Sequence, residues 1–262
     1  MDFTLSKFCD IVDAGLESGY NVGGVSDLFD GKLDTPFIVL RHDVDRRPGQ
    51  ALDMAREEAK RGVRASYYFR YVPSSFDEDI IREIAAMGHE VGYHYEDWYA
   101  KRYDLAAAKA HFEEQIARLN AIEGVTVGTI CMHGSPLSRD NNMTIWDHIS
   151  FEDYGLKDCI MSQDYSGFAF FTDSGRTFGE TSANLRDELG NADLFPDVKT
   201  TPDVCQFIRD TRADKIMVSC HPERWTNKPA AWSSQFAKDQ AVNMIKRGLR
   251  VARAVKGNKK AA

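Results

Sequence analysis

The sequence lacks the features that mark membrane, secreted and disulfide-rich proteins. No stretch approaches the roughly 18 uninterrupted apolar residues of a transmembrane helix, so we expect no insertion into a membrane. Residues 1–7 contain no basic segment followed by a long apolar run, so we expect no secretory signal peptide. The five cysteines form no C-x-x-C pair, which favours reduced thiols over a disulfide framework or a zinc ribbon. We therefore expect a cytoplasmic protein.

An excess of positive charge is also missing. The formal net charge of −7 argues against nucleic acid as a partner, because nucleic-acid-binding faces are basic. A hydrophobic content of 43% with 28% charged residues is typical of a globular protein. A chain of 262 residues can bury one substantial core, so we predict a single domain over residues 1–262.

Short apolar runs alternate with longer helical patterns along the chain. Apolar residues at helical spacing predict an amphipathic helix over residues 4–16, ahead of the main fold. Residues 151–200 are mostly polar and irregular, and we interpret them as a loop-rich insertion. The alternation predicts an α/β fold with a parallel sheet flanked by helices. Strands are expected at 36–40, 65–69, 90–93, 127–132, 168–171 and 215–219, and helices at 48–61, 77–87, 105–122, 144–148, 202–212 and 234–255.

Polar residues end four of these predicted strands. The carboxyl ends of parallel strands form the functional rim of α/β folds. Four such clusters from separate strands converge most naturally on the mouth of a barrel, although periodicity alone does not distinguish a barrel from an open sheet. We therefore expect a distorted (β/α)7–8 barrel with one site at its rim. The clusters lie at residues 41–45, 94–97, 133–136 and 220–222.

The first cluster places two carboxylates on one face of its strand. Arg41, Asp43 and Asp45 share parity and therefore point to the same side. Two carboxylates so close repel each other unless a cation lies between them. One aspartate could therefore bind a metal while the other acts as a base. The alternative is that Arg41, Arg46 and Arg47 neutralise both in surface ion pairs.

The histidines differ in their expected roles. His94 ends its strand and is the natural imidazole ligand, whereas His89 begins the same strand and is expected to be structural. His221 ends the last clear strand, where a group with a near-neutral pKa suits general acid catalysis, although a structural role is the alternative. His133 could be a metal ligand, a substrate contact or a hydrogen-bonding loop residue.

Five residues complete the candidate site as substrate-binding groups. Trp98 and Trp225 could form an apolar platform for a sugar, although scattered aromatic residues are more often part of the core. Arg176 could bind a carboxylate or phosphate, or could be a solvated turn residue. Arg41 and Ser135 are included because they lie in the clusters at the strand ends.

These motifs resemble those of the polysaccharide deacetylase (NodB-like) family of carbohydrate esterases over residues 37–225. Residues 88–94 read Gly-His-Glu-Val-Gly-Tyr-His and fit the family's G-H-E-[IV]-G-x-H pattern throughout. Asp43 and Asp45 match its D-x-D motif, and His221 matches the histidine that ends its last motif. The resemblance implies a distorted barrel and a divalent metal, usually Zn²⁺. It also implies that Asp45 and His94 are ligands, Asp43 is the base and His221 is the general acid.

The sequence departs from the family at one ligand position. The family's second metal-binding histidine follows the first by four residues, and here that residue is Trp98. Either His133, Glu96 or Asp97 then completes the metal shell, or the metal binds weakly, or the site serves another purpose. The third family motif, rich in arginine and proline, is also replaced, here by residues 132–138.

The resemblance implies a metal-dependent hydrolase that removes an N-acyl group, most simply N-acetyl, from an amino sugar or sugar precursor. The chain is similar to an intracellular branch of the family that is associated with bacterial surface polysaccharide biosynthesis. The expected substrate is therefore a nucleotide-linked or lipid-linked amino sugar. Two alternatives remain open: a catalytically degenerate barrel that binds a carbohydrate or a partner protein, and a metal-free hydrolase of small cyclic amides.

Overall fold

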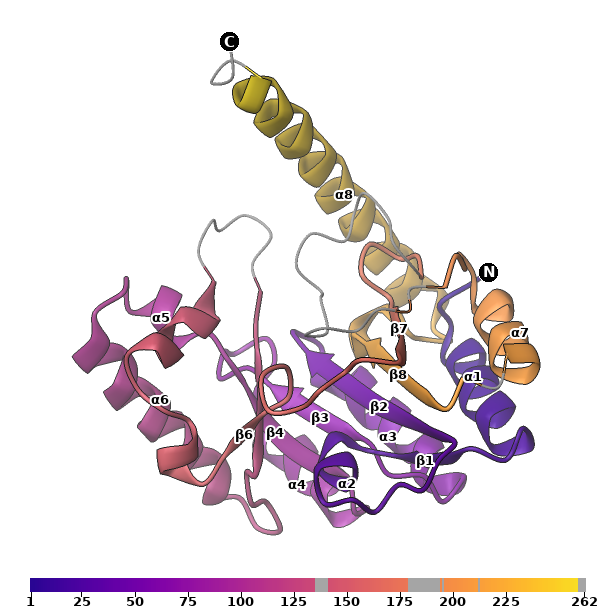
Figure 1. Ribbon diagram of the computed structural model, residues 1–262, viewed down its shortest axis with the longest axis horizontal. Coiled ribbons are helices and arrows are strands. Elements are labelled where there is room, and N and C mark those ends of the chain that lie inside the picture. The colour runs from indigo at the N-terminus through magenta and orange to yellow at the C-terminus, as the bar shows by residue number, and fades with distance from the viewer. Residues whose placement is uncertain (135–140, 179–193, 195, 212, 259–262) are drawn as a thin grey trace.

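The computed structural model describes residues 1–134, 141–178, 194, 196–211 and 213–258 (Figure 1). Its centre is a curled parallel sheet with the strand order β6-β5-β4-β3-β2-β8-β7. Within the described residues no pairing joins β6 to β7, so the sheet forms a half-barrel. The strands are β2 (Phe37–Val44), β3 (Ser66–Phe69), β4 (Glu90–Tyr95), β5 (Thr129–Met132), β6 (Lys157–Asp158), β7 (Phe168–Thr172) and β8 (Lys215–Cys220).

Helices connect the strands and cover the sheet, as the alternating pattern predicted. The α-helices are α1 (Leu5–Glu17), α2 (Val25–Phe29), α3 (Pro48–Lys60), α4 (Glu78–Ala86), α5 (Asp97–Ala100), α6 (Leu105–Asn120), α7 (Thr201–Thr211) and α8 (Pro229–Asn258). The described residues also contain the short 3-10 helices η1 (Asn142–Asp147), η2 (Glu152–Tyr154) and η3 (Pro222–Arg224). The side chains of Thr4, Asp77 and Asp104 accept hydrogen bonds from the first turns of α1, α4 and α6, which fixes where these helices begin.

Several short elements differ from the sequence-based expectation. The strand β1 (Asn21–Gly23) pairs with the first residues of β2, and β3 pairs with the last residues of β2. Neither β1, α2 nor β6 was predicted, because two to five residues are too few to show a period. Residues 142–147 form a 3-10 helix in place of the predicted helix at 144–148. The expected amphipathic N-terminal helix is confirmed as α1, which packs against α7 and α3.

The strands bury side chains on both faces. On the outer face, alternate residues of β2 such as Ile38, Leu40 and Val44 join the larger core beneath the helices. On the inner face, Phe37 and Val39 join a smaller core inside the curl, together with residues of β3, β5, β7 and β8. This inner core fills the amino-terminal end of the curl. The polar residues of the candidate site lie at the carboxyl-terminal end, whereas Ser66, Glu90 and Thr129 form a hydrogen-bonded group at the amino-terminal ends of β3, β4 and β5.

The helix α8 runs away from the rest of the molecule, and its C-terminal turns are the part farthest from the sheet (Figure 1). Its first turns pack near η3, directly after β8. The structure thus brings the start of α8 to the same end of the sheet as the carboxyl ends of the strands. None of the helices among the described residues combines the length and apolarity needed to cross a bilayer.

Candidate active site

The sheet register brings the polar strand ends together at one rim. His42 pairs with Cys220 across β2 and β8, so the next residues, Asp43 and His221, are neighbours. Adjacent strands lie about 4.8 Å apart, which places these two side chains in one site. His94 pairs with Cys131 across β4 and β5 in the same way. The strand β3 lies between β4 and β2, so His94 is two strands from Asp43.

The ion pair between Arg41 and Asp43 forms the floor of this site. Arg41 donates from Nε to Asp43 Oδ1 at 3.1 Å and from Nη2 to Oδ2 at 2.6 Å, and both side chains are buried. Burial opposes ionisation of Asp43, but Arg41 and His94 outweigh it and hold the pKa of this carboxyl below its usual value. The parity argument is confirmed, because His42 faces the opposite side and contacts Glu58 of α3 at 2.7 Å. Arg41 therefore orients a carboxylate and is too buried to be a surface contact for substrate.

The second histidine of the G-H-E-V-G-Y-H segment is held in one tautomer. His94 Nδ1 lies 2.9 Å from the carbonyl oxygen of Cys131, which can only accept, so Nδ1 carries the hydrogen. Burial lowers the pKa of His94 to about 4, with a further lowering from His133 that Asp43 and Asp45 only partly offset. His94 is therefore neutral at pH 7 and its Nε2 lone pair is available.

His133 is held in the same way by a carboxylate. Its Nδ1 lies 3.0 Å from Glu96 Oε2, and Arg70 also binds Glu96 with donor–acceptor distances of 2.8 Å. Burial raises the pKa of Glu96, but His133 and Arg70 outweigh it and lower that pKa to about 2. Glu96 is therefore an anion that accepts a hydrogen bond from Nδ1 of His133. The Nε2 atom then lies on the side of the ring that faces away from Glu96.

Both free imidazole nitrogens face the same oxygen atom. Asp45 Oδ1 lies 3.6 Å from His94 Nε2 and 3.4 Å from His133 Nε2. This oxygen is buried and has no hydrogen-bond partner among the described residues. Ligands placed 2.0–2.2 Å from a tetrahedral zinc ion are roughly 3.3–3.6 Å apart. The two distances from Asp45 Oδ1 are therefore compatible with an ion shared by Asp45, His94 and His133.

Of the three candidates for the remaining ligand, only His133 faces Asp45 in this way. Glu96 supports His133, as described above. Asp97 is fully buried and accepts from Tyr93 Oη at 3.0 Å, with His111 Nδ1 at 2.5 Å. Trp98 stands where the family has a histidine, and its ring packs on Tyr103 and His148.

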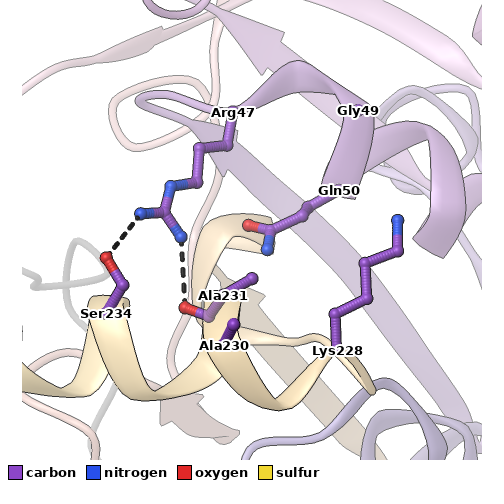
Figure 2. Close-up of a pocket in the computed structure, with 7 residues that line it drawn as sticks. All are labelled: Arg47, Gly49, Gln50, Lys228, Ala230, Ala231 and Ser234. Atoms are coloured by element: carbon purple, nitrogen blue, oxygen red, sulfur yellow. Dashed lines mark hydrogen bonds between the residues drawn. The ribbon is translucent and has the colours of Figure 1, made fainter.

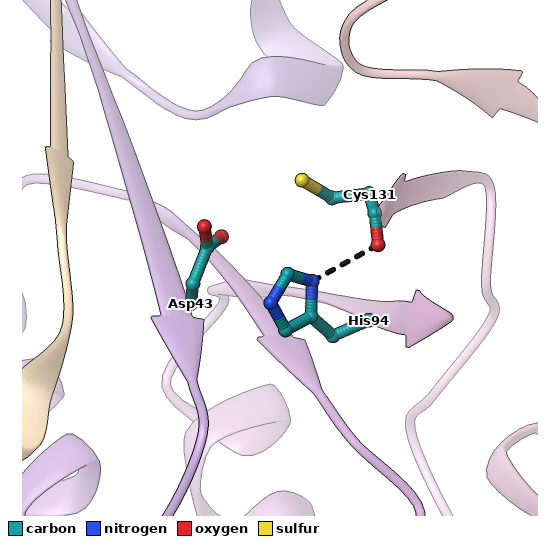
Figure 3. Close-up of side chains that lie close together, drawn as sticks. All are labelled: Asp43, His94 and Cys131. Atoms are coloured by element: carbon teal, nitrogen blue, oxygen red, sulfur yellow. Dashed lines mark hydrogen bonds between the residues drawn. The ribbon is translucent and has the colours of Figure 1, made fainter. Parts of the chain in front are cut away.

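A second group of potential ligands overlaps the first. Side-chain atoms of Asp43, His94 and Cys131 lie within 4.8 Å of one another, and all three residues are buried (Figure 3). However, Asp43 is already neutralised by Arg41, and burial raises the pKa of the Cys131 thiol well above its usual value. A thiolate is the metal-binding form of cysteine, so this group is the less favourable site for a cation.

On the other side of Asp43, His221 forms a strong pair with Asp173, the residue directly after β7. His221 Nδ1 lies 2.7 Å from Asp173 Oδ1, and the His221 backbone N–H donates to Oδ2 at 2.8 Å. Burial and Arg224 lower the pKa of His221, but Asp173 and Asp45 outweigh them and raise it to about 9. The imidazole is therefore protonated at neutral pH and can donate a proton.

Asp173 is a site residue that the sequence analysis missed. It also accepts from Arg224 Nη1 at 2.6 Å and from Trp225 Nε1 at 2.7 Å, and it is fully buried. These donors keep it anionic despite its burial. Its position directly after a strand was the available signal, because the carboxyl ends of parallel strands share one edge.

A buried glutamate lies in the segment that follows His221. Glu223 is fully buried, and neither carboxylate oxygen has a hydrogen-bond partner among the described residues. Arg46 Nε lies 3.5 Å from its Oε1. Burial and the nearby charge of Asp45 raise the pKa of Glu223 to about 7. Nothing in the sequence distinguished this glutamate from a surface residue.

Two proposed substrate contacts do not fit their positions. Trp225 has no exposed surface and packs against Phe3 and Phe8, so its ring offers no face for a sugar. Arg176 is also buried: it binds Asp239 Oδ2 at 2.8 Å and stacks on Trp232. In this structure both side chains have partners inside the protein, which favours the alternative that Trp225 is part of the core.

Two other expectations can be placed more briefly. Ser135 lies outside the described residues. His89 is structural, as expected: its Nδ1 accepts from the Ala65 backbone N–H at 3.1 Å, and its Nε2 contacts the Ala55 carbonyl at 3.0 Å.

The chain was also compared with known proteins. No protein-family model and no curated protein matches the sequence.

Proposed function

We propose that this protein is a metal-dependent hydrolase that removes an N-acyl group, most simply N-acetyl, from an amino sugar or sugar precursor. One observation carries the proposal: the Nε2 atoms of His94 and His133 lie 3.6 Å and 3.4 Å from an Asp45 oxygen that has no hydrogen-bond partner among the described residues. The motifs at residues 43–45, 88–94 and 217–221 support the same assignment, because they resemble those of polysaccharide deacetylases. The half-barrel is compatible with the distorted barrel of that family.

The roles follow from the charge states of the residues. Asp45, His94 and His133 would hold the divalent ion, for which Zn²⁺ suits the mixed nitrogen and oxygen donors. Such an ion supplies Lewis acidity, which polarises a carbonyl group and lowers the pKa of water. Asp43 remains ionised beside Arg41 and accepts the proton of the attacking water.

Hydrolysis then needs a proton for the departing amine. Attack of water forms the new C–O bond and cleavage breaks the C–N bond, so the products are a carboxylate and an amine. His221 is protonated at neutral pH because of Asp173, and it lies across the site from the imidazole pair. It donates its proton to the amine nitrogen. Asp43 thus accepts a proton from water, and His221 donates a proton to the amine.

Metal content and acetate release from acetamido sugars test this proposal together. We expect the wild-type protein to retain about one equivalent of Zn²⁺, Co²⁺, Ni²⁺ or Mn²⁺ after dialysis and to release acetate. Asp45→Asn and His133→Ala should lose both metal and activity. His148→Ala is the matched control, since this exposed histidine lies outside the proposed ligand set. Metal retention by both ligand variants, or the absence of acetate release from every sugar, would contradict the proposal.

A further inference from the structure

A pocket of about 510 Å³ lies beside the rim of the sheet (Figure 2). It is lined by the start of α3, which directly follows the Asp43–Asp45 segment, and by the start of α8, which follows His221 and η3. Arg47 follows Asp45 by two residues, so their Cα atoms are at most about 7.6 Å apart. The pocket is therefore adjacent to the candidate active site. Its lining residues are Arg47, Gly49, Gln50, Lys228, Ala230, Ala231 and Ser234.

Arg47 gives the pocket a positive charge that no carboxylate of the described residues balances. Arg47 donates to the Ala231 carbonyl at 3.2 Å and to Ser234 Oγ at 3.3 Å, and both acceptors are neutral. Among the described residues no carboxylate lies within ion-pair distance of Arg47, whereas Lys228 pairs with Asp53 at 3.0 Å. In a protein with a net charge of −7, this uncompensated guanidinium is a specific local feature.

The two helices add to the attraction for anions. The first turn of each α-helix has backbone N–H groups without intrahelical partners, and the helix dipole is positive there. The pocket is lined by Gly49 and Gln50 from the first turn of α3 and by Ala230 and Ala231 from that of α8. The Gln50 N–H already donates to the Arg47 carbonyl, so the two helix starts favour a negatively charged group mainly through their dipoles.

Gln50 provides an independent sign of a ligand. Its side chain lies between those of Arg47 and Lys228 in Figure 2 and is only 7% exposed. Its Oε1 is buried without a hydrogen-bond partner among the described residues. A buried polar atom without a partner destabilises the fold unless something binds it. The amide can accept from a hydroxyl and donate to an anionic oxygen, so it suits a ligand that carries both.

We propose that this pocket binds a phosphate or diphosphate group of the substrate, with Arg47 as its principal contact and Gln50 as a contact to a neighbouring hydroxyl. This inference rests on the proposed function and narrows its substrate class to phosphorylated amino sugars. The acyl group would then lie at the rim, next to Asp43 and Asp45. The volume is sufficient for a phosphate together with part of the sugar or nucleoside that carries it.

Binding of inorganic phosphate and pyrophosphate tests the pocket without any need for catalysis. Titration calorimetry at constant ionic strength would compare the wild type with Arg47→Asn, which removes the guanidinium but tolerates the left-handed backbone at this position (φ 56°). Loss of a charge-assisted hydrogen bond should weaken binding about 10- to 100-fold. Arg56→Gln removes the same charge from the exposed face of α3 and should leave binding unchanged.

A second variant shows whether a loss of binding could instead result from misfolding. Lys228 is 73% exposed, so Lys228→Gln should fold normally and weaken pyrophosphate binding by a smaller factor than Arg47→Asn. Thermal unfolding would be measured for every variant. The pocket assignment is overturned if the wild type binds neither anion at millimolar concentration, or if Arg47→Asn and Arg56→Gln bind equally well.

Kinetics separate the failure of this inference from that of the proposed function. Arg47→Asn should raise KM about 10- to 100-fold for an acetamido sugar 1-phosphate and leave KM for the neutral sugar unchanged. Nucleoside-diphosphate and lipid-diphosphate amino sugars would be compared to identify the source of the phosphate. Arg47-dependent phosphate binding without hydrolysis of any sugar would uphold the pocket and refute the hydrolase. Hydrolysis with equal kcat/KM for neutral and phosphorylated sugars would refute the pocket alone.

Discussion

Replacing Asp173 by asparagine should lower the pKa of His221, the proposed proton donor, so that it loses its proton at neutral pH. The pKa of His221 is about 9 in the folded protein, compared with an ordinary value of 6.5. Asp173 is the largest influence that raises it, against the lowering by burial and Arg224. In Asp173→Asn the anion is gone while burial and Arg224 remain. We therefore expect the pKa of His221 to fall to 6.5 or lower.

The size of the effect follows from the two pKa values. Each pKa unit corresponds to about 1.36 kcal/mol, so the gap between 6.5 and about 9 corresponds to roughly 3 kcal/mol. The unfolded chain releases this proton near pH 6.5. The contribution of His221 to the free energy of unfolding is therefore fully present below pH 6.5 and is lost as the pH rises through 9. This dependence should disappear in Asp173→Asn.

Two measurements check this expectation. NMR titration of the histidine Cε1–H resonances would follow His221 directly, with His221→Gln used for assignment. Denaturant unfolding between pH 6 and 10 would report the stability of both proteins. Asp10→Asn, which breaks an exposed ion pair with Lys7, is a control that should change neither result. A wild-type His221 that titrates at or below 6.5, or an Asp173→Asn protein with an unchanged titration, would refute the reasoning.

Three further predictions concern the base, the ligand set and the outer face of the sheet. Asp43→Asn should reduce hydrolysis by about 10²–10⁴ with metal content nearly unchanged, and loss of metal in elemental analysis would contradict its role as a base. Cys131→Ala should retain both metal and activity, because only its backbone carbonyl contacts His94; a fall in bound metal would favour the Asp43–His94–Cys131 group. Burial lowers the pKa of His89, so the free energy of unfolding should fall as the pH drops from 6.5 toward that lower pKa. His89→Gln should flatten this dependence in urea unfolding, and an unchanged slope would show that other groups cause it.

The strands, and the polar strand ends that meet at the candidate site, could be predicted because their signals are local. The β2 segment alternates between two faces over eight consecutive residues, and this parity alone separates Asp43 from His42. The polar residues at the ends of β2, β4 and β8 follow directly from the rule that parallel strands share a functional edge. Elements of two to five residues, such as β6 and α2, were missed because they are set by tertiary contacts and not by periodicity.

The partners of the site residues could not be predicted, because they come from distant parts of the chain. Asp173 precedes His221 by 48 residues and meets it only because β7 pairs with β8. Trp225 follows His221 closely in sequence and was therefore considered as a sugar contact. Its ring is buried beside Phe8, and its indole N–H donates to Asp173. From the sequence, Arg176 could have bound a ligand, but in the structure its guanidinium forms an ion pair with Asp239 of α8.

In the proposed ligand set, His133 takes the place of the histidine that the family pattern has at the position of Trp98. In the family pattern, both histidines belong to one short segment, so a local helical turn sets their spacing. Here His94 ends β4 and His133 follows β5, and their common direction depends on the register that pairs His94 with Cys131. The same register supplies the carbonyl oxygen that fixes the tautomer of His94. A slip of one residue between β4 and β5 would turn one imidazole to the other face of the sheet and separate the two ligands. The proposed ligand geometry therefore depends on sheet pairing, which a search for a contiguous motif would not detect.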